Sequence, residues 1–229
     1  MSDICPVTLY HGTSSIFLPS ILENGLGGIN AVKEWRILEL ARDIFPYVEE
    51  KFKDDYRFNT FKKMVNQEIL SNGQNFQHGD VYLSASQTVA VKYTADRELG
   101  SELLTRTLEF LQMLIDLDCK TVISDLYKKY KPLYNFLRVH AAPLLVEIQN
   151  LDYEDLLNED GSIVDLKTKE YIEKITLDYP ERTYNRDEML QLNFRLKKVV
   201  KKENLKISLI GVKKIGNFEL DYDLYPLNV

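Results

Sequence analysis

The sequence predicts an α+β fold, in which a β-sheet core carries two long helical segments. Three observations support this prediction. Short β-prone stretches lie near both chain ends, apolar residues between them recur at helical steps of three and four residues, and no Pro-, Gly- or Ser-rich linker divides the chain. We therefore expect one domain over 1–229, with helical insertions at about 27–79 and 100–140.

The first part of the chain shows a strand, a turn and then mostly helices. Residues 6–10 (PVTLY) alternate and are β-prone, so they predict a first strand, and HGTSS predicts a tight turn after it. Thr13 or Ser14 is expected to cap a helix over 16–22, with Gly25 as its C-cap. The patterns that follow are a helical stretch at 30–71, a polar loop at 72–80, a strand at 81–85, and helices at 88–99, 101–118 and 121–138.

The last part of the chain is rich in strand patterns. Residues 142–151 (APLLVEIQNL) are apolar through their middle, as in a central strand. The alternation in DEMLQLN (187–193) predicts a strand that begins with Asp187 and Glu188. The remaining patterns predict a basic turn or helix at 195–204, a strong strand at 205–215 and a final strand at 218–227, with 171–179 ambiguous between helix and strand.

Composition excludes several classes of protein. The 29 Lys and Arg residues against 35 Asp and Glu give a net charge of −6, which excludes a polycation that coats nucleic acid by bulk charge. Only three His and two distant Cys are present, with no Cys-x-x-Cys, so we expect no metal site. No stretch reaches the roughly 20 apolar residues of a membrane span. The N-terminus lacks a signal-peptide pattern, so we expect a cytoplasmic protein without membrane contact.

Two motifs carry side chains suited to holding a ligand. In LYHGTSS (9–15), His11 can donate a hydrogen bond at the end of the first strand while Gly12 exposes its backbone. A surface turn with an incidental His is the alternative. In the segment 79–99, Tyr82 and Tyr93 can meet across a strand–turn–helix hairpin and form a slot for a flat cationic ring. Packing of both rings in the core is the alternative.

A carboxylate is the third candidate. Glu188, at the start of the strand expected at 187–193, can pair with a ribose hydroxyl and stabilise positive charge that develops on a sugar. The adjacent Asp187 is the main alternative, because a shift of one residue in register brings the other side chain to the same side. Weaker candidates are Glu147, Glu170 and Glu181. A solvated acid at the end of a strand is the alternative without function.

Taken in order, these motifs resemble the ADP-ribosyltransferase superfamily, and within it the His-Tyr-Glu branch that includes diphtheria toxin and the poly(ADP-ribose) polymerases. The resemblance lies in two blocks, 9–26 and 80–95, and is weaker at PLLVEI (143–148) and at the glutamate. The matching residues are Tyr10, His11, Gly12, Thr13, Leu22, Gly25, Leu26, Val81, Tyr82, Leu83, Ser84, Ala90 and Tyr93. The resemblance implies a split mixed β-sheet core, from which the two helical insertions are departures.

The resemblance also implies that NAD is the substrate and that no metal takes part. His11 would hydrogen-bond the nicotinamide-side ribose, Gly12 would bind the carboxamide through its backbone, and Thr13 would lie near the adenosine. Tyr82 and Tyr93 would sandwich the nicotinamide ring. The family resemblance alone implies these roles, because the spacing of the residues does not define them.

Two further roles follow from the same resemblance. Ser84 would support the nicotinamide pocket, and Glu188 would hold the ribose 2′-hydroxyl and stabilise the oxocarbenium-like transition state. A related family, the RNA 2′-phosphotransferases, has a second His where this chain has Tyr82, so that family is disfavoured.

The expected activity is therefore transfer of ADP-ribose to an intracellular macromolecule, with RNA or DNA slightly favoured over protein. A basic strip beside Glu188 suits a phosphate backbone and consists of Arg195, Lys197, Lys198, Lys201, Lys202 and Lys206, with Phe194 nearby. A solvated amphipathic turn is the alternative for this strip. By family analogy we expect a toxin of a toxin–antitoxin or phage-defence system, with an antitoxin as partner. The alternative function is a non-catalytic module that binds NAD, ADP-ribose or a partner protein.

Overall fold

The computed structural model describes residues 3–71, 74–97, 99–117, 120–180, 183–215 and 220–228. The chain divides into two compact units. The sheet unit comprises 1–29, 80–100 and 141–229, and the helical unit comprises 30–79 and 101–140. The helical unit thus begins and ends within a few residues of the segments expected as insertions, 27–79 and 100–140. That the chain acts as one domain stays a prediction.

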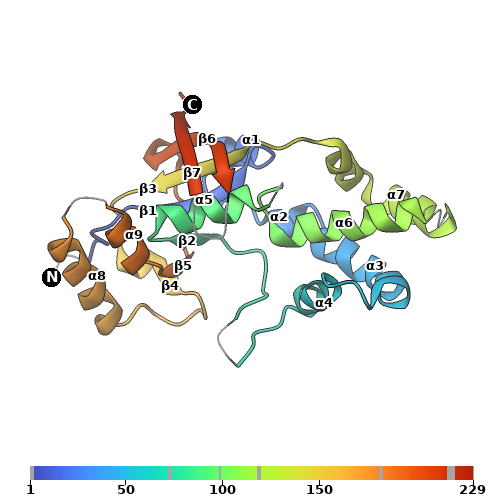
Figure 1. Cartoon of the computed structure of the whole chain (residues 1–229), viewed down its shortest axis with the longest axis horizontal. Coiled ribbons are helices and arrows are strands. Elements are labelled where there is room, and N and C mark those ends of the chain that lie inside the picture. Colours follow the sequence, from blue (N-terminus) through green and yellow to red (C-terminus); the bar gives the residue numbers. More distant parts are fainter. Residues whose placement is uncertain are drawn as a thin grey trace. The chain divides into compact units, whose positions relative to one another are not determined.

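The sheet unit is built on a sheet of seven described strands, in the order β4-β5-β2-β1-β3-β6-β7 (Figure 1). Every neighbouring pair of these strands is antiparallel. The α+β class is therefore confirmed, whereas the expected split mixed sheet is corrected to one hydrogen-bonded antiparallel sheet. The strands are β1 (Leu9–Ser14), β2 (Tyr82–Ser84), β3 (Pro143–Ile148), β4 (Leu156–Asn158), β5 (Asn193–Leu196), β6 (Leu205–Ile215) and β7 (Leu220–Pro226).

The two faces of this sheet have different coverings. Helix α5 (Gln87–Ala95) packs on one face, where Tyr10 and Leu145 contact Ala90 and Val91; we call this the α5 face. The opposite face carries Leu9 and the larger core, which also contains residues of three other helices. These helices are α1 (Leu18–Asn24), α8 (Leu166–Asp178) and α9 (Tyr184–Met189). Alternate residues of β1 therefore belong to different cores, as the period of two in a strand requires.

The helical unit contains α2 (Ala31–Glu34), α3 (Ile37–Phe52), α4 (Phe58–Asn66), α6 (Glu102–Asp116), α7 (Lys120–Tyr134) and the 3-10 helix η1 (Asn135–Arg138). Apolar side chains at three- and four-residue steps on α3 and α6 are fully buried, which is the amphipathic pattern seen in the sequence. Phe61 of α4 and Phe110 of α6 pack with ring centroids 4.9 Å apart. This unit therefore has an apolar core of its own.

Several sequence predictions are confirmed, and others are wrong for identifiable reasons. Gly25 ends α1 with a φ of 79° and donates its N–H to the Ile21 carbonyl, as expected for a C-cap. Neither Thr13 nor Ser14 caps α1, because both belong to β1. His11, Gly12 and Thr13 form no tight turn, since β1 pairs with β3 along its whole length. The ambiguous segment 171–179 is helical as far as residue 178.

The segment 187–193 is the most consequential correction. It is not a strand: residues 184–189 form α9, and β5 begins only at Asn193. Thr183 caps α9 by accepting a hydrogen bond from the Arg186 N–H. Asp187 and Leu190 are both buried and three residues apart, which is a helical spacing. The strand that lies beside β2 therefore starts five residues after Glu188.

Candidate functional site

His11 connects the two blocks of the motif. Its Nδ1 donates a hydrogen bond of 2.8 Å to the carbonyl oxygen of Tyr82, which lies 71 residues away in the sequence. A carbonyl only accepts, so Nδ1 carries the proton and Nε2 of the neutral ring keeps its lone pair. Desolvation lowers the pKa of His11, and the bond to Tyr82 opposes this only in part. At neutral pH Nε2 is therefore an acceptor for a hydroxyl group.

Gly12 lies directly beneath α5. A Cβ atom at this position would lie 2.2 Å from the carbonyl oxygen of Ala90, so only glycine lets the helix approach so closely. Next along β1, the Thr13 carbonyl accepts a hydrogen bond from Oγ1 of Thr94. The motif His-Gly-Thr thus attaches α5 to the sheet, and this packing is a reason for glycine that needs no ligand.

The side chains of Tyr82 and Ser84 lie on the α5 face. Ser84 is opposite Tyr10 of β1 and opposite Asn193 of β5, and residues directly opposed in an antiparallel pair share a face. Tyr82, two residues earlier, is opposite Arg195. Because residues alternate along β1, His11 lies on the other face from Tyr82 and Ser84. The predicted residues are therefore close in the sheet, but His11 meets this pair through the Tyr82 backbone.

Tyr93 lies on α5, the helix that covers this same face. Its ring is 37 % exposed, and the guanidinium carbon of Arg97 lies 4.2 Å from the ring centroid. Arg97 also donates a hydrogen bond of 3.2 Å from Nη1 to the Tyr93 carbonyl. A planar cation thus already stacks on this tyrosine, which is the kind of contact expected for a cationic ring.

The carboxylates proposed from the sequence have different surroundings from those expected. Glu188 is exposed on α9 and is not at the start of a strand. Asp187 is buried and accepts hydrogen bonds from the Ser86 hydroxyl and from the backbone N–H groups of Gln87 and Thr88. These donors belong to the first turn of α5, so Asp187 caps that helix.

The weaker candidates also differ from one another. Glu147 of β3 is opposite Tyr10 and forms an ion pair of 3.1 Å with Lys206. Glu170 is exposed on α8. Glu181 lies outside the described residues.

Two carboxylates near Tyr82 and Ser84 were missed by the sequence reasoning. Glu159, just after β4, accepts a hydrogen bond of 3.4 Å from Nδ2 of Asn193. Asp80 forms an ion pair of 2.8 Å with Arg195. Asp80 could have been found from the sequence, because side chains two residues apart in a strand point to the same face and Asp80 is two residues before Tyr82. Nothing local pointed to Glu159, since its place depends on the pairing of β4 with β5.

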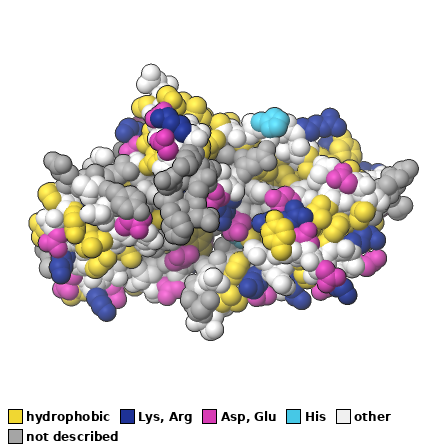
Figure 2. All heavy atoms as spheres, in the orientation of Figure 1, with side chains coloured by type: hydrophobic (Ala, Val, Ile, Leu, Met, Phe, Trp, Pro, Cys, Tyr) yellow, Lys and Arg dark blue, Asp and Glu magenta, His cyan; other side chains and the backbone are white. Residues whose placement is uncertain are grey.

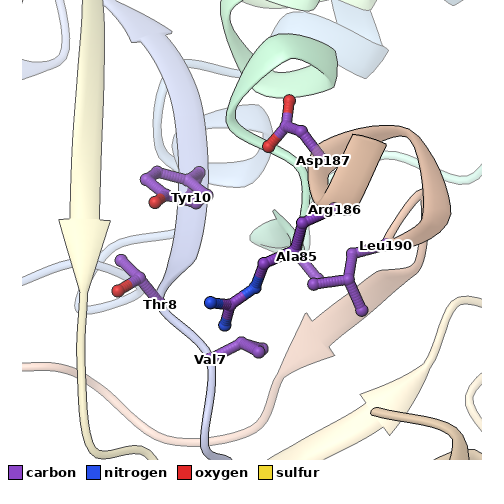
Figure 3. Close-up of a pocket in the computed structure, with 7 residues that line it drawn as sticks. All are labelled: Val7, Thr8, Tyr10, Ala85, Arg186, Asp187 and Leu190. Atoms are coloured by element: carbon purple, nitrogen blue, oxygen red, sulfur yellow. The ribbon is translucent and has the colours of Figure 1, made fainter. Parts of the chain in front are cut away.

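A small pocket lies between the start of β1 and α9 (Figure 3). Val7, Thr8 and Tyr10 line one side, while α9 contributes Arg186 and Asp187. Arg186 extends toward Val7 and Thr8, whereas Asp187 turns toward the start of α5. The volume of about 90 Å³ is well below the roughly 300–1,000 Å³ of typical ligand pockets. This pocket is too small for a dinucleotide.

The basic strip 195–206 carries less unpaired positive charge than its sequence indicates. Lys198 contacts the carboxylates of Glu154 and Asp155. Arg195 and Lys206 are paired with Asp80 and Glu147, as described above. Lys197 donates to the backbone carbonyl of Glu154. Three of the six cations of the strip are therefore ion-paired within the sheet unit, while Lys197, Lys201 and Lys202 have no ion-pair partner among the described residues.

Comparisons with known proteins add no constraint on this site. No protein-family model, no curated protein sequence and no solved structure matches the chain. Within the described ranges, the structure contains no cluster of three or more His, Cys, Asp or Glu side chains able to hold a metal ion. Among those residues there is also no helix with the length and apolar character needed to cross a membrane.

Proposed function

We propose that the protein is an NAD-dependent ADP-ribosyltransferase that modifies an intracellular macromolecule, as the toxin of a toxin–antitoxin or phage-defence system. The observation that carries the proposal is the hydrogen bond from His11 to the Tyr82 carbonyl. It joins the two sequence blocks that resemble the family. The packing of α5 on Gly12 adds support, because α5, which carries Tyr93 at an exposed position, covers the same face of the sheet as Tyr82.

The proposed chemistry needs few groups. Tyr82 and Tyr93 stack on the nicotinamide ring, and Nε2 of His11 accepts a hydrogen bond from a ribose hydroxyl. The bond from ribose C1′ to the ring nitrogen breaks, and its electron pair neutralises the cationic ring. Positive charge then develops on the ribose, where a carboxylate stabilises it. The acceptor nucleophile bonds to C1′ and releases its proton to water.

Glu159 is better placed than Glu188 to supply this carboxylate. The exposed hydrogen bond of 3.4 Å that it accepts from Asn193, the residue directly opposite Ser84, brings it beside β2, whereas Glu188 lies on α9 and forms no hydrogen bond or ion pair with β2 or β5 in the described part of the chain. Asn193 acts as a positioning residue in this arrangement, because its amide donates to the carboxylate. We assign the transition-state role to Glu159 on this geometry.

The second candidate is a module that binds NAD or ADP-ribose without turnover. One observation favours it: the β5 residues opposite Ser84 and Tyr82 are Asn193 and Arg195, and neither can carry negative charge. Such a module needs the tyrosines but no carboxylate. The two candidates therefore differ in their dependence on Glu159.

The first experiment uses purified protein and NAD labelled on the adenylate phosphate, incubated with separate pools of protein, DNA and RNA. A transferase labels one pool, which also identifies the acceptor class. Nicotinamide release gives a second readout that is independent of the acceptor. NAD binding with neither label nor released nicotinamide would support the binding module. Absence of NAD binding would refute the transferase, and absence of both NAD and ADP-ribose binding would refute both functions.

Variants then test the carboxylate. Glu159→Gln should reduce nicotinamide release by about 10²–10³-fold while leaving NAD affinity within a few-fold. The matched control is Glu188→Gln, a substitution of an exposed glutamate that should leave turnover unchanged.

A double variant tests whether Asn193 acts through Glu159. Asn193→Ala should lower turnover as well, and the double variant Glu159→Gln/Asn193→Ala should lose no more activity than Glu159→Gln, because both substitutions remove the same hydrogen bond. Full activity of Glu159→Gln would exclude this residue without refuting the transferase.

A further inference from the structure

The helix α7 and the adjoining η1 carry a strong local excess of positive charge. Residues 120–138 contain five Lys or Arg against one Asp, a net charge of +4 in a chain whose total is −6. Two of these cations are paired, Lys128 with Asp125 and Lys129 with Asp43. Lys131 and Arg138 are exposed and have no ion-pair partner in the part of the chain that the structure describes. The segment therefore presents cationic groups to solvent.

The same segment, which is kinked at Tyr130, carries two tyrosines that pack against each other. Tyr127 and Tyr134 form an edge-to-face pair with ring centroids 5.1 Å apart and an interplanar angle of 87°. Tyr127 is 45 % exposed, and the hydroxyl of Tyr134 donates to the Ile123 carbonyl at 3.4 Å. In such a pair the ring that contributes its edge keeps both of its own faces uncovered by its partner. We call Tyr127, Lys131, Tyr134 and Arg138 the α7 stripe.

The chemistry of the α7 stripe favours one class of partner. Single-stranded nucleic acid offers flat bases that stack on aromatic rings and phosphates that bind cations, and proteins that bind it without sequence preference combine these two features. A duplex hides its base faces, and an acidic protein segment uses the cations but not the rings. Figure 2 shows Lys and Arg side chains mixed with hydrophobic ones, and with Asp and Glu side chains, at the right of the view, where Figure 1 places α6 and α7.

We propose that the α7 stripe is a binding surface for single-stranded nucleic acid. The stripe belongs entirely to the helical unit and does not rest on the NAD chemistry proposed for the sheet unit. Bases stack on Tyr127 and Tyr134, while Lys131 and Arg138 contact phosphates. This surface is separate from the strip 195–206, which belongs to the sheet unit and in which three of six cations are ion-paired.

The test is fluorescence anisotropy with the full chain, without NAD. The probes are end-labelled single-stranded oligo(dT) and oligo(U) of equal length and a duplex of the same length. Binding of either single strand well above the duplex supports the proposal, and the stronger of the two identifies DNA or RNA as the partner. Three results would overturn it. These are equal affinity for the single strands and the duplex, displacement of the probe by poly-glutamate as readily as by unlabelled oligonucleotide, and no binding of any probe.

Variants separate stacking from charge. Tyr127→Ala should weaken single-strand binding about 5- to 100-fold, whereas Tyr56→Ala should not, although Tyr56 is 86 % exposed in the same unit. Lys131→Gln should reduce the slope of log affinity against log salt by about 0.7, the value for one phosphate contact on a single strand. Lys128→Gln is the control for charge, because Lys128 is already paired with Asp125. Equal effects of Tyr56→Ala and Tyr127→Ala would contradict the assignment.

Discussion

Replacing Gly12 by alanine tests the packing on which the candidate site depends. The added Cβ would lie 2.2 Å from the carbonyl oxygen of Ala90 and 3.3 Å from Cβ of Thr94. The oxygen belongs to the backbone of α5, so no side-chain rotation relieves the clash. The helix must move away from β1 by about an ångström, and Tyr93 moves with it. Gly12→Ala therefore affects both the stability of the sheet unit and the predicted stacking slot.

The size of the effect depends on two opposing contributions. Overpacking a well-packed core costs about 1–3 kcal/mol of unfolding free energy. Replacing glycine by alanine in an ordinary backbone conformation stabilises by about 0.4–1 kcal/mol, because the unfolded chain loses entropy. With backbone atoms on both sides of the clash, we expect the upper part of the range and a net loss of about 2 kcal/mol. For a chain of this length that lowers Tm by about 4–8 °C.

The matched control is Gly211→Ala on β6. Its added Cβ would also be close to a neighbour, 2.7 Å from Cε2 of Tyr225, but this atom belongs to the side chain of a residue that is 52 % exposed. The Tyr225 hydroxyl donates an exposed hydrogen bond of 3.3 Å to Asp223, so the ring can shift. The unfolded-state contribution is the same for both variants. We therefore expect Gly211→Ala to stay within about 1 kcal/mol of the wild type. Thermal unfolding and NAD titration of both variants complete the comparison.

One outcome would contradict the packing described for Gly12. If Gly12→Ala unfolds at the same temperature as Gly211→Ala and binds NAD with wild-type affinity, α5 does not pack on β1 at this position. Loss of NAD binding without loss of stability would instead indicate that the Gly12 backbone contacts the ligand directly. The two roles of this glycine are thus separable by experiment.

The hydrogen-bond network supports three further predictions. Desolvation lowers the pKa of His11 below its ordinary value of 6.5. As the pH falls, this histidine therefore takes up a proton in the unfolded chain before it does so in the folded protein, and the free energy of unfolding should decrease below about pH 6.5. Denaturant titrations at several pH values should show a weaker dependence of this free energy on pH for His11→Asn. Asp187→Ala leaves three donors at the start of α5 unsatisfied and should cost about 2–3 kcal/mol, while Glu188→Gln should cost less than about 0.5 kcal/mol. Tyr130→Phe removes a hydrogen bond to Asp43 and should destabilise by about 1 kcal/mol in the same assay.

The sequence was informative where a long periodic pattern coincided with burial. The apolar steps in 30–71 and 101–118 correspond to helices with buried apolar faces, and the strand predicted at 205–215 is β6. Gly25 was predictable because a helix end needs a residue that accepts a positive φ. These features depend on neighbours in the chain, which is why composition and spacing alone were enough.

The predictions that were wrong concern segments whose conformation depends on contacts with residues far away in the sequence. His-Gly-Thr has the composition of a turn, yet β3, more than a hundred residues later, pairs with all of it and keeps it extended. DEMLQLN alternates over too few residues to distinguish a strand from a short helix. Its helical form is fixed by the Thr183 cap and by burial of Asp187 under α5, and neither contact is visible from local pattern.

Strand register also decides which carboxylate can serve the proposed reaction. Had 187–193 been a strand beside β2, Glu188 would have stood at its start. Because β5 begins at Asn193, the residue opposite Ser84 is an amide, and an amide cannot balance positive charge on a ribose. It can, however, hold a carboxylate, and the one it holds is Glu159 from the turn after β4. The mechanism proposed above therefore uses two residues in place of one, Asn193 on β5 and Glu159 just after β4, and turnover by this route should depend on the β4–β5 pairing as well as on the acid itself.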